Sequence, residues 1–273
     1  MEPASTQIAS GPALSAATAT PFAKYVDSHT HLDMTFTKFK FTGGWDAWRT
    51  NVLRDPNCEK IISVACEPQS LTVHEELARH DDIYVTFGIH PHNAKDYTDA
   101  IERQIIEIFG RTPGKAVAWG EMGLDYHYNL SPHDIQKEVF IRQIRRANEL
   151  HLPFVIHTRE AEDDTLAIFR EHIPRETKMH VHCFQAVPST IGFTGVVTYK
   201  SAKATQEAAR IVPLNRMLLE TDAPYMAPIP FRGRDCHSAM IPHTAAEVAR
   251  LRGCSVEEIF RACRANTTEM YGV

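Results

Sequence analysis

Short apolar runs alternate with helix-like periodicity along the chain from residue 24 onward. The short runs, which are rich in β-branched, aliphatic and aromatic residues, predict eight strands at 25–29, 60–66, 83–89, 115–121, 153–157, 178–184, 191–197 and 216–222. Apolar residues at helical spacing predict helices at 69–80, 98–110, 132–151, 161–173, 242–252 and 255–271. Because continuous apolar strands are typical of a sheet buried on both faces, these strands are expected to be parallel. Strands that alternate with helices in this way predict an α/β fold, a TIM-type (β/α)8 barrel over residues 24–273.

The interval between the sixth and seventh strands departs from this rhythm. Only residues 185–190 separate the strands at 178–184 and 191–197, and Pro188 lies among them. A crossover between parallel strands takes about a dozen residues or more and usually contains a helix. We therefore expect the barrel to lack the helix between strands six and seven, and expect its outer wall there to be bare or distorted. A doubly wound open sheet is the alternative, but no G-x-G-x-x-G motif opens the first helix.

The composition fits a folded domain and limits the partners it can have. The 273 residues are 43% hydrophobic and 23% charged, which allows a sizeable core. The formal net charge of −5 excludes a generally basic nucleic-acid coat, so a polyanion would have to be held by a local patch or a metal. No run approaches about eighteen apolar residues, so no membrane partner is expected. No feature of the sequence indicates an obligatory protein partner.

The N-terminal segment, residues 1–23, is rich in Ala, Ser and Thr and is expected to be a disordered tail. It lacks the basic start and apolar core of a secretory signal, and the arginines of a transit peptide. The six cysteines form no C-x-x-C pair, which favours free thiols in a reducing compartment. These features predict a cytoplasmic location, a nuclear one, or both.

Candidate metal ligands stand at the ends of the predicted strands. His29 and His31 are two residues apart, so both imidazoles face the same side of the strand, which in a barrel is the lumen. Four further strands end in donor residues, which are Glu121, His157, His182 and Asp222. Because barrel active sites lie at the carboxyl ends of the strands, we expect these side chains to converge. Glu220 faces the same side as Asp222 and is a candidate to support the ligands rather than to bind metal.

The donor set suits two divalent cations, and zinc, magnesium and manganese all accept mixtures of imidazole and carboxylate. A carboxylate can bridge two cations about 3.5–4 Å apart, and Glu121, which is central in strand order, is the candidate bridge. Asp222 would bind one cation and accept the proton of an attacking water. Glu121 and Asp222 are therefore the candidate catalytic residues.

Several sequence blocks resemble the signature motifs of TatD-like metal-dependent deoxyribonucleases, a family of the amidohydrolase barrel superfamily. The blocks are VDSHTHLD (26–33), GIHPH (88–92), GEMGLDYH (120–127), PFVIHTRE (153–160), HCF (182–184), TGVVTYK (194–200) and LLETDAPY (218–225). The resemblance covers nearly the whole chain and identifies residues 24–273 as a metal-dependent hydrolase barrel domain. It implies hydrolysis of phosphodiester bonds in DNA with divalent cations, often as a 3′-to-5′ exonuclease. The ligands of the family fall on the same six residues that strand geometry selects.

A second group of residues is expected to contact the substrate. His90 ends the third strand, and the family pattern implies that it lies near the scissile phosphate. Candidate phosphate ligands that follow strand ends or lie in the loop after strand eight are Arg159, Lys200, Arg232 and Arg234. Candidates to stack on bases are Tyr126, His127 and Tyr225. Because an acidic chain offers few cationic contacts, we expect it to hold single-stranded DNA ends rather than to coat a duplex.

Two other functions fit the same sequence. An amide or cyclic-amide hydrolase of the superfamily would use the same cations. Many such enzymes have a modified lysine at the end of strand four, where this chain has Glu121, so the resemblance favours phosphodiester hydrolysis. A non-catalytic scaffold or an impaired variant would follow if the missing crossover helix displaced His182, which lies just before the shortened link. Comparing hydrolysis of a phosphodiester with hydrolysis of dipeptides tests for an amide hydrolase. Comparing the melting temperature with and without a chelator tests whether the metal site is formed.

Overall fold

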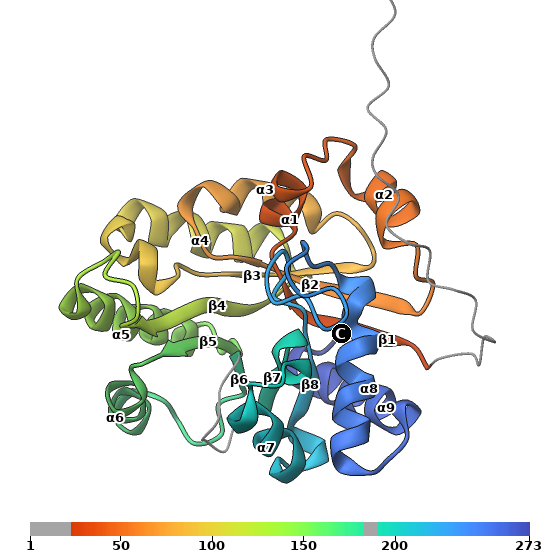
Figure 1. Cartoon of the computed structure of the whole chain (residues 1–273). Helices are drawn as coiled ribbons and strands as arrows, with labels where there is room; N and C mark the ends of the chain where they lie inside the picture. Colours follow the sequence, from red (N-terminus) through yellow and green to blue (C-terminus); the bar gives the residue numbers. More distant parts are fainter. Residues whose placement is uncertain (1–22, 183–189) are drawn as a thin grey trace, which may run out of the picture.

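Eight parallel strands form a barrel in the computed structural model, which describes residues 23–182 and 190–273 (Figure 1). The strands are β1 Tyr25–Thr30, β2 Cys58–Ala65, β3 Ile83–Phe87, β4 Ala116–Asp125, β5 Phe154–Arg159, β6 Met179–His182, β7 Thr190–Phe193 and β8 Met217–Leu219. Each strand is hydrogen-bonded to the next in chain order. The barrel closes where the segment after β8 meets β1, because the Asp222 N–H donates to the His29 carbonyl over 2.9 Å. The fold is therefore the predicted TIM-type barrel.

Helices lie around the outside of the strands (Figure 1). They are α1 Leu32–Lys38, α2 Gly44–Trp48, α3 Leu71–Leu77, α4 Asp99–Arg111, α5 His133–Glu149, α6 Glu162–His172, α7 Lys203–Ile211, α8 Ile241–Arg252 and α9 Val256–Tyr271. Shorter 3-10 turns include η3 Pro91–Asp96 and η4 Gly195–Thr198. Across residues 23–182 and 190–273, none of the helices combines the length and the apolar character that a membrane crossing needs.

The described elements differ from the predicted ones mainly at their ends. Residues 195–197, expected to continue the seventh strand, belong instead to η4, where the Thr194 hydroxyl accepts a hydrogen bond from the Val196 N–H. The strand β8 stops at Leu219, three residues before Asp222. The helices α1, α2 and α7 lie outside the predicted ranges. Short helices show too few turns for a periodic apolar pattern to identify them.

The outer faces of β6 and β7 are covered, contrary to the expectation of a bare wall. Val181 points outward because its neighbours in β6 face the lumen, and it is fully buried. Ile191 and Phe193 of β7 are 5% and 2% exposed, and they share the main hydrophobic cluster with Phe169 of α6 and Ala208 of α7. The two strands pair in parallel, with Val181 opposite Ile191. The predicted absence of a crossover helix concerns residues 183–189, which lie outside the described residues, as does the predicted tail at 1–22.

The C-terminal helix α9 contributes to the barrel interior. Its start is fixed by Ser255, whose side chain accepts a hydrogen bond from the Glu258 N–H, and Gly272 ends it in the left-handed conformation with φ 74°. Its last turn places Met270 and Tyr271 in a separate hydrophobic cluster inside the barrel. The other buried members of that cluster are Ile62, Val117, Ala118, Val155 and Leu218. Val117 and Val155 are each the second residue of their strand. This cluster, called the plug below, therefore lies near the amino ends of the strands.

Candidate metal centre

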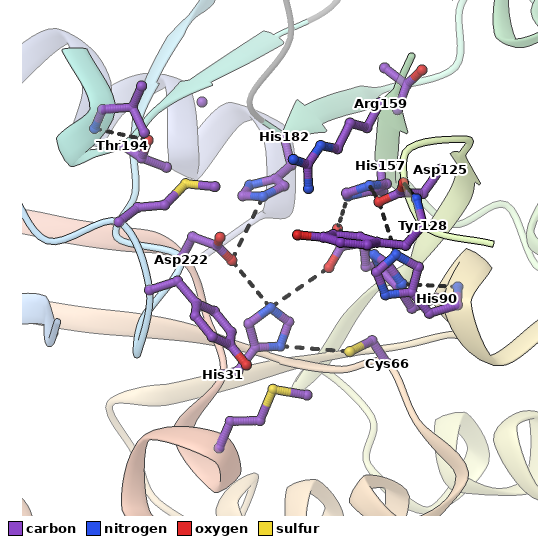
Figure 2. Close-up of a pocket in the computed structure, with 18 of the residues that line it drawn as sticks. His31, Cys66, His90, Asp125, Tyr128, His157, Arg159, His182, Thr194 and Asp222 are labelled. Atoms are coloured by element: carbon purple, nitrogen blue, oxygen red, sulfur yellow. Dashed lines mark hydrogen bonds and ion pairs between the residues drawn. The ribbon is translucent and has the colours of Figure 1, made fainter. Parts of the chain in front are cut away.

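The six predicted donors converge at the carboxyl ends of the strands. His31 Nε2 lies 3.3 Å from His29 Nε2 and 3.4 Å from Asp222 Oδ1, although Asp222 is far from both histidines in the sequence. His182 Nε2 lies 3.7 Å from the same Asp222 oxygen. Five of the donors line a cleft of about 680 Å³ (Figure 2), and the sixth, His29, is fully buried. His182 therefore lies close to the other donors and is not displaced in the way that the short link after strand six could have caused.

The chain after β8 aims Asp222 back over the lumen. The Thr221 N–H and hydroxyl both donate to the carboxylate of Asp27, over 3.1 and 2.7 Å, which ties this segment to β1. Asp222 itself has φ 55°, a left-handed conformation that short polar side chains tolerate better than most residues. The sequence ETDAPY thus turns the carboxylate toward the histidines of β1 and β6.

Glu121 directs its two carboxylate oxygens at different histidines. Its Oε2 lies 3.4 Å from His29 Nε2 and 3.7 Å from His31 Nε2. Its Oε1 lies 3.0 Å from His157 Nδ1 and 3.9 Å from His90 Nε2. Donor triplets that include His29, His31 and Asp222 on one side, and His90, Glu121 and His157 on the other, each place their ligand atoms within 4.8 Å. This is the arrangement expected of a bridging carboxylate between two cation positions.

Hydrogen bonds behind two of the histidines fix which ring nitrogen faces the cleft. His31 Nδ1 lies 3.0 Å from the Val64 carbonyl, which can only accept, so Nδ1 carries the proton when the ring is neutral. His182 Nδ1 lies 2.9 Å from Glu220 Oε1 and donates to it in the same way. When the rings are neutral, the Nε2 atoms of both then present lone pairs to Asp222. Lone pairs and a carboxylate repel one another, so this geometry calls for positive charge between them.

The pKa shifts agree with a site built for cations. Burial, followed by the neighbouring His182, lowers the pKa of His29 to about 4, which favours the neutral imidazole that metals bind. Burial by itself would raise the pKa of Glu121, but His29 and His157 outweigh it, and the net pKa lies well below its usual value. Burial by itself would lower the pKa of His31, but Cys66 and Asp222 outweigh this effect, and the net pKa lies well above its usual value. A cation at this position would therefore replace a proton.

Asp125 is a site residue that the sequence analysis missed. Its Oδ2 lies 3.1 Å from His157 Nε2 and 2.9 Å from His92 Nε2, so it holds both imidazoles. Burial opposes ionisation of Asp125, but the hydrogen bond and charge of His157 hold its pKa well below the usual range. The signal was present in the sequence, because Asp125 follows Glu121 by four residues within β4 and so faces the same side.

Of the predicted substrate residues, His90 and Arg159 line the cleft, while Lys200 and Arg232 are exposed and are not among its lining residues. The Arg232 guanidinium instead lies over the Tyr199 ring at 4.4 Å. The predicted stacking residue Tyr225 lines the cleft and is 55% exposed.

Tyr126 and His127 are not among the residues that line the cleft. The Tyr126 hydroxyl donates to Asp164 over 2.5 Å, and its ring stacks on His133. His127 Nδ1 lies 2.6 Å from the Glu160 carboxylate. Tyr128 occupies the rim instead: it is 47% exposed, and the Arg159 guanidinium lies 5.0 Å from its ring centre (Figure 2).

Comparison with known proteins agrees with this geometry. A family model described as TatD related DNase matches residues 26–272. The chain is 38% identical over 269 residues to a human protein named 3′-5′ RNA nuclease TATDN2, covering 91% of this chain but 35% of that protein, about a third of its length. It is 31% identical over 211 residues to a Pantoea ananatis protein named 3′-5′ ssDNA/RNA exonuclease TatD, covering 72% and 80% of the two chains. The solved structure of the TatD homologue YjjV from Escherichia coli superimposes with a TM-score of 0.80 at 26% identity, covering 91% of this chain and 98% of that one. This chain therefore belongs to the TatD family of metal-dependent hydrolases.

Proposed function

We propose that this chain is a 3′-to-5′ exonuclease that hydrolyses phosphodiester bonds at single-stranded DNA ends with two divalent cations. The observation that carries this proposal is the arrangement of Glu121 and Asp222, whose oxygens lie 3.0 to 3.7 Å from ring nitrogens of His29, His31, His157 and His182. The names of the human and Pantoea relatives support a nucleic-acid substrate and the 3′-to-5′ direction.

The donors of the centre fit two cations as ligands. His29, His31 and Asp222 would hold one cation, and Glu121 and His157 would hold the other, with His182 Nε2 near the Asp222 carboxylate as the sixth ligand. The chemistry that the cations would supply is polarisation of the phosphate and a lowered pKa for an attacking water. Zinc, manganese and magnesium all suit this mixture of imidazole and carboxylate.

Residues of the chain itself would hold the substrate and move the proton. Asp222, which lines the cleft and has an oxygen 3.4 Å from His31 Nε2, would accept the proton of the attacking water. His90 lines the cleft beside Glu121, and Arg159 stands at the rim, where a guanidinium can bind a phosphate with two hydrogen bonds. These two residues would orient the scissile phosphate over the carboxylates.

The rim of the cleft favours an unpaired strand over a duplex. Tyr128 and Tyr225 both line the cleft and leave about half of their surface exposed. Exposed aromatic rings stack on unpaired bases, whereas the bases of a duplex already stack on one another. The acidic chain offers little cationic surface for the paired phosphates of a duplex.

Replacing Tyr128 with leucine is expected to raise KM for a single-stranded oligonucleotide about tenfold, because one base loses its stacking partner. The rate of hydrolysis of bis-p-nitrophenyl phosphate, which has no base, should stay within a factor of about two. Tyr126→Leu is the matched control, since Tyr126 lies outside the cleft lining, and it should change neither substrate's KM. Equal KM values for the two variants would remove Tyr128 from the substrate site.

The proposed function is tested with oligonucleotides of one sequence labelled at the 5′ end. A 3′-to-5′ exonuclease produces a ladder of labelled fragments that shortens with time, and single-stranded DNA should be cleaved faster than the duplex. Single-stranded RNA of the same sequence and a panel of dipeptides test the other substrate classes. Release of the labelled nucleotide first, or hydrolysis of dipeptides alone, would contradict the proposal.

A further inference from the structure

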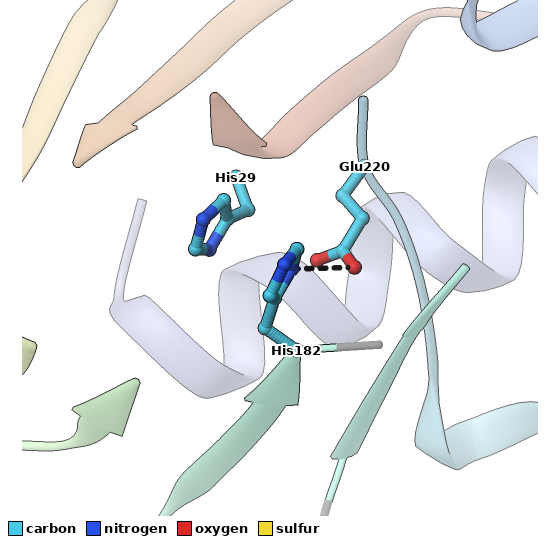
Figure 3. Close-up of side chains that lie close together, drawn as sticks. All are labelled: His29, His182 and Glu220. Atoms are coloured by element: carbon cyan, nitrogen blue, oxygen red, sulfur yellow. Dashed lines mark hydrogen bonds and ion pairs between the residues drawn. The ribbon is translucent and has the colours of Figure 1, made fainter. Parts of the chain in front are cut away.

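A buried polar chain leads from the C-terminal helix to the candidate metal centre. The Tyr271 hydroxyl lies 2.6 Å from His180 Nδ1, and His180 Nε2 lies 2.8 Å from Glu220 Oε2. The other oxygen of Glu220 accepts from His182 Nδ1 over 2.9 Å, and Figure 3 shows that carboxylate beside the His182 ring. His180 and Glu220 are fully buried, and Tyr271 is 6% exposed. The chain thus links a helix end near the amino side of the barrel to a metal donor on its carboxyl side.

The distances along this chain are consistent with the following assignment of protons. The Glu220 carboxylate lies between the two imidazoles, with one oxygen 2.8 Å from His180 Nε2 and the other 2.9 Å from His182 Nδ1. A carboxylate accepts only, so His182 donates Nδ1–H to one oxygen, and we place the proton of His180 on Nε2, close to the other oxygen. His180 Nδ1 is then an acceptor and receives the Tyr271 hydroxyl proton. Under this assignment His182 keeps its Nε2 lone pair for the cleft.

The surrounding residues make room for this polar chain inside an apolar barrel. His180 and His182 lie two residues apart on β6, so both face the lumen, one below the other. Gly192 of β7 lies opposite the Glu220 carboxylate, and a Cβ at this position would overlap its atoms. Tyr271 enters from the plug that α9 forms with Ile62 and Leu218. Buried polar groups cost free energy unless they are paired, so this network depends on its hydrogen bonds and on the close pairing of His180 with Glu220.

We propose that Tyr271 and His180 are positioning residues that act through Glu220 to hold His182 in the tautomer and orientation that bind metal. The proposal rests on the metal centre of the proposed function. Groups behind a metal-binding histidine fix its tautomer and ring orientation, and their loss typically weakens metal affinity about 10- to 100-fold. Along this polar chain Tyr271 is two side chains further from the metal site than Glu220. Its loss should therefore weaken metal affinity by a factor at the lower end of this range.

The test measures zinc binding to the full chain by titration in a chelator buffer. Tyr271→Phe removes only the hydroxyl and is expected to raise the zinc Kd about tenfold, while Glu220→Gln raises it about 100-fold. Tyr97→Phe is the matched control, because Tyr97 is also 6% exposed and its hydroxyl also bonds a carboxylate, that of Glu102, away from the cleft. Both tyrosine variants lose one buried hydrogen bond, so a purely structural role would leave their zinc Kd values equal.

A second measurement needs no variant. Long-range ¹H–¹⁵N correlation spectra of the wild-type protein should show the ring proton of His182 on Nδ1 and that of His180 on Nε2. The opposite tautomers would overturn the proposal even if Tyr271→Phe failed to fold. Wild-type protein that binds no zinc would contradict the proposed function and this inference together. Tight wild-type binding with equal Kd values for Tyr271→Phe and Tyr97→Phe would overturn the inference alone.

Discussion

Replacing Glu121 with alanine is expected to lower kcat/KM by at least about a thousandfold, through loss of the cations. The two oxygens of Glu121 face both histidine groups, at 3.4 Å from His29 Nε2 and 3.0 Å from His157 Nδ1. Without this carboxylate, the nearby imidazoles lose the negative charge that offsets a second cation. A loss of about 4 kcal/mol of transition-state stabilisation corresponds to this factor. Metal analysis and a nuclease assay on the same preparation measure both effects.

The stability of the Glu121→Ala protein separates loss of metal from loss of fold. The wild type should melt at a lower temperature when a chelator removes its cations, whereas the variant should show no such shift. Glu102→Ala is the control: Glu102 is another buried carboxylate, paired with Arg142 and Arg146. Its loss should lower the melting temperature while metal content and activity per folded protein stay unchanged. Full activity in Glu121→Ala would discard the assigned centre.

Asp222→Asn is expected to lower kcat by about a thousandfold while most of the bound metal is retained. The amide keeps the size of the side chain and one oxygen near His31 and His182, but it cannot accept a proton. General base catalysis contributes about 10²- to 10⁴-fold, which sets the size of the effect. The measurement is kcat on a single-stranded oligonucleotide at saturating Mn²⁺, with metal content determined in parallel. Recovery of full activity at high Mn²⁺ would show that Asp222 serves only as a ligand.

Two rules about strands account for the donors that lie on strands, which are His29, Glu121, His157 and His182. Side chains two residues apart share a face, and parallel strands bring their carboxyl ends to one rim, so His29, His31 and the strand-end donors could be placed together before any coordinates. The same alternation reaches Asp125, four residues after Glu121 in β4. Sequence order thus carried most of the information about the floor of the cleft.

The rim of the cleft was harder to predict, because alternation ends where the strand ends. β4 stops at Asp125, and the next residue, Tyr126, turns away to bond Asp164, which leaves Tyr128 at the rim. Arg232 lies in the loop after β8, beyond the reach of strand alternation, and its guanidinium lies over the Tyr199 ring. The link between Tyr271 and His180 spans 91 residues, and no local pattern connects a helix end to a strand across that distance.

The burial of Val181, Ile191 and Phe193 also lay beyond the sequence rules. Counting residues between β6 and β7 showed that the link is short, but it did not show which side chains cover the strands. Coverage depends on how neighbouring elements such as α6 and α7 pack, which is a tertiary effect.

The most direct test of the account is the number of divalent cations bound per chain. Purified protein, incubated with Zn²⁺ or Mn²⁺ and freed of excess metal, is analysed for metal by mass spectrometry beside its Glu121→Ala variant. The account predicts close to two cations per wild-type chain, since Glu121 faces two separate histidine groups, and fewer than one in the variant. Wild-type protein with no bound cation, or with the same metal content as Glu121→Ala, would contradict it.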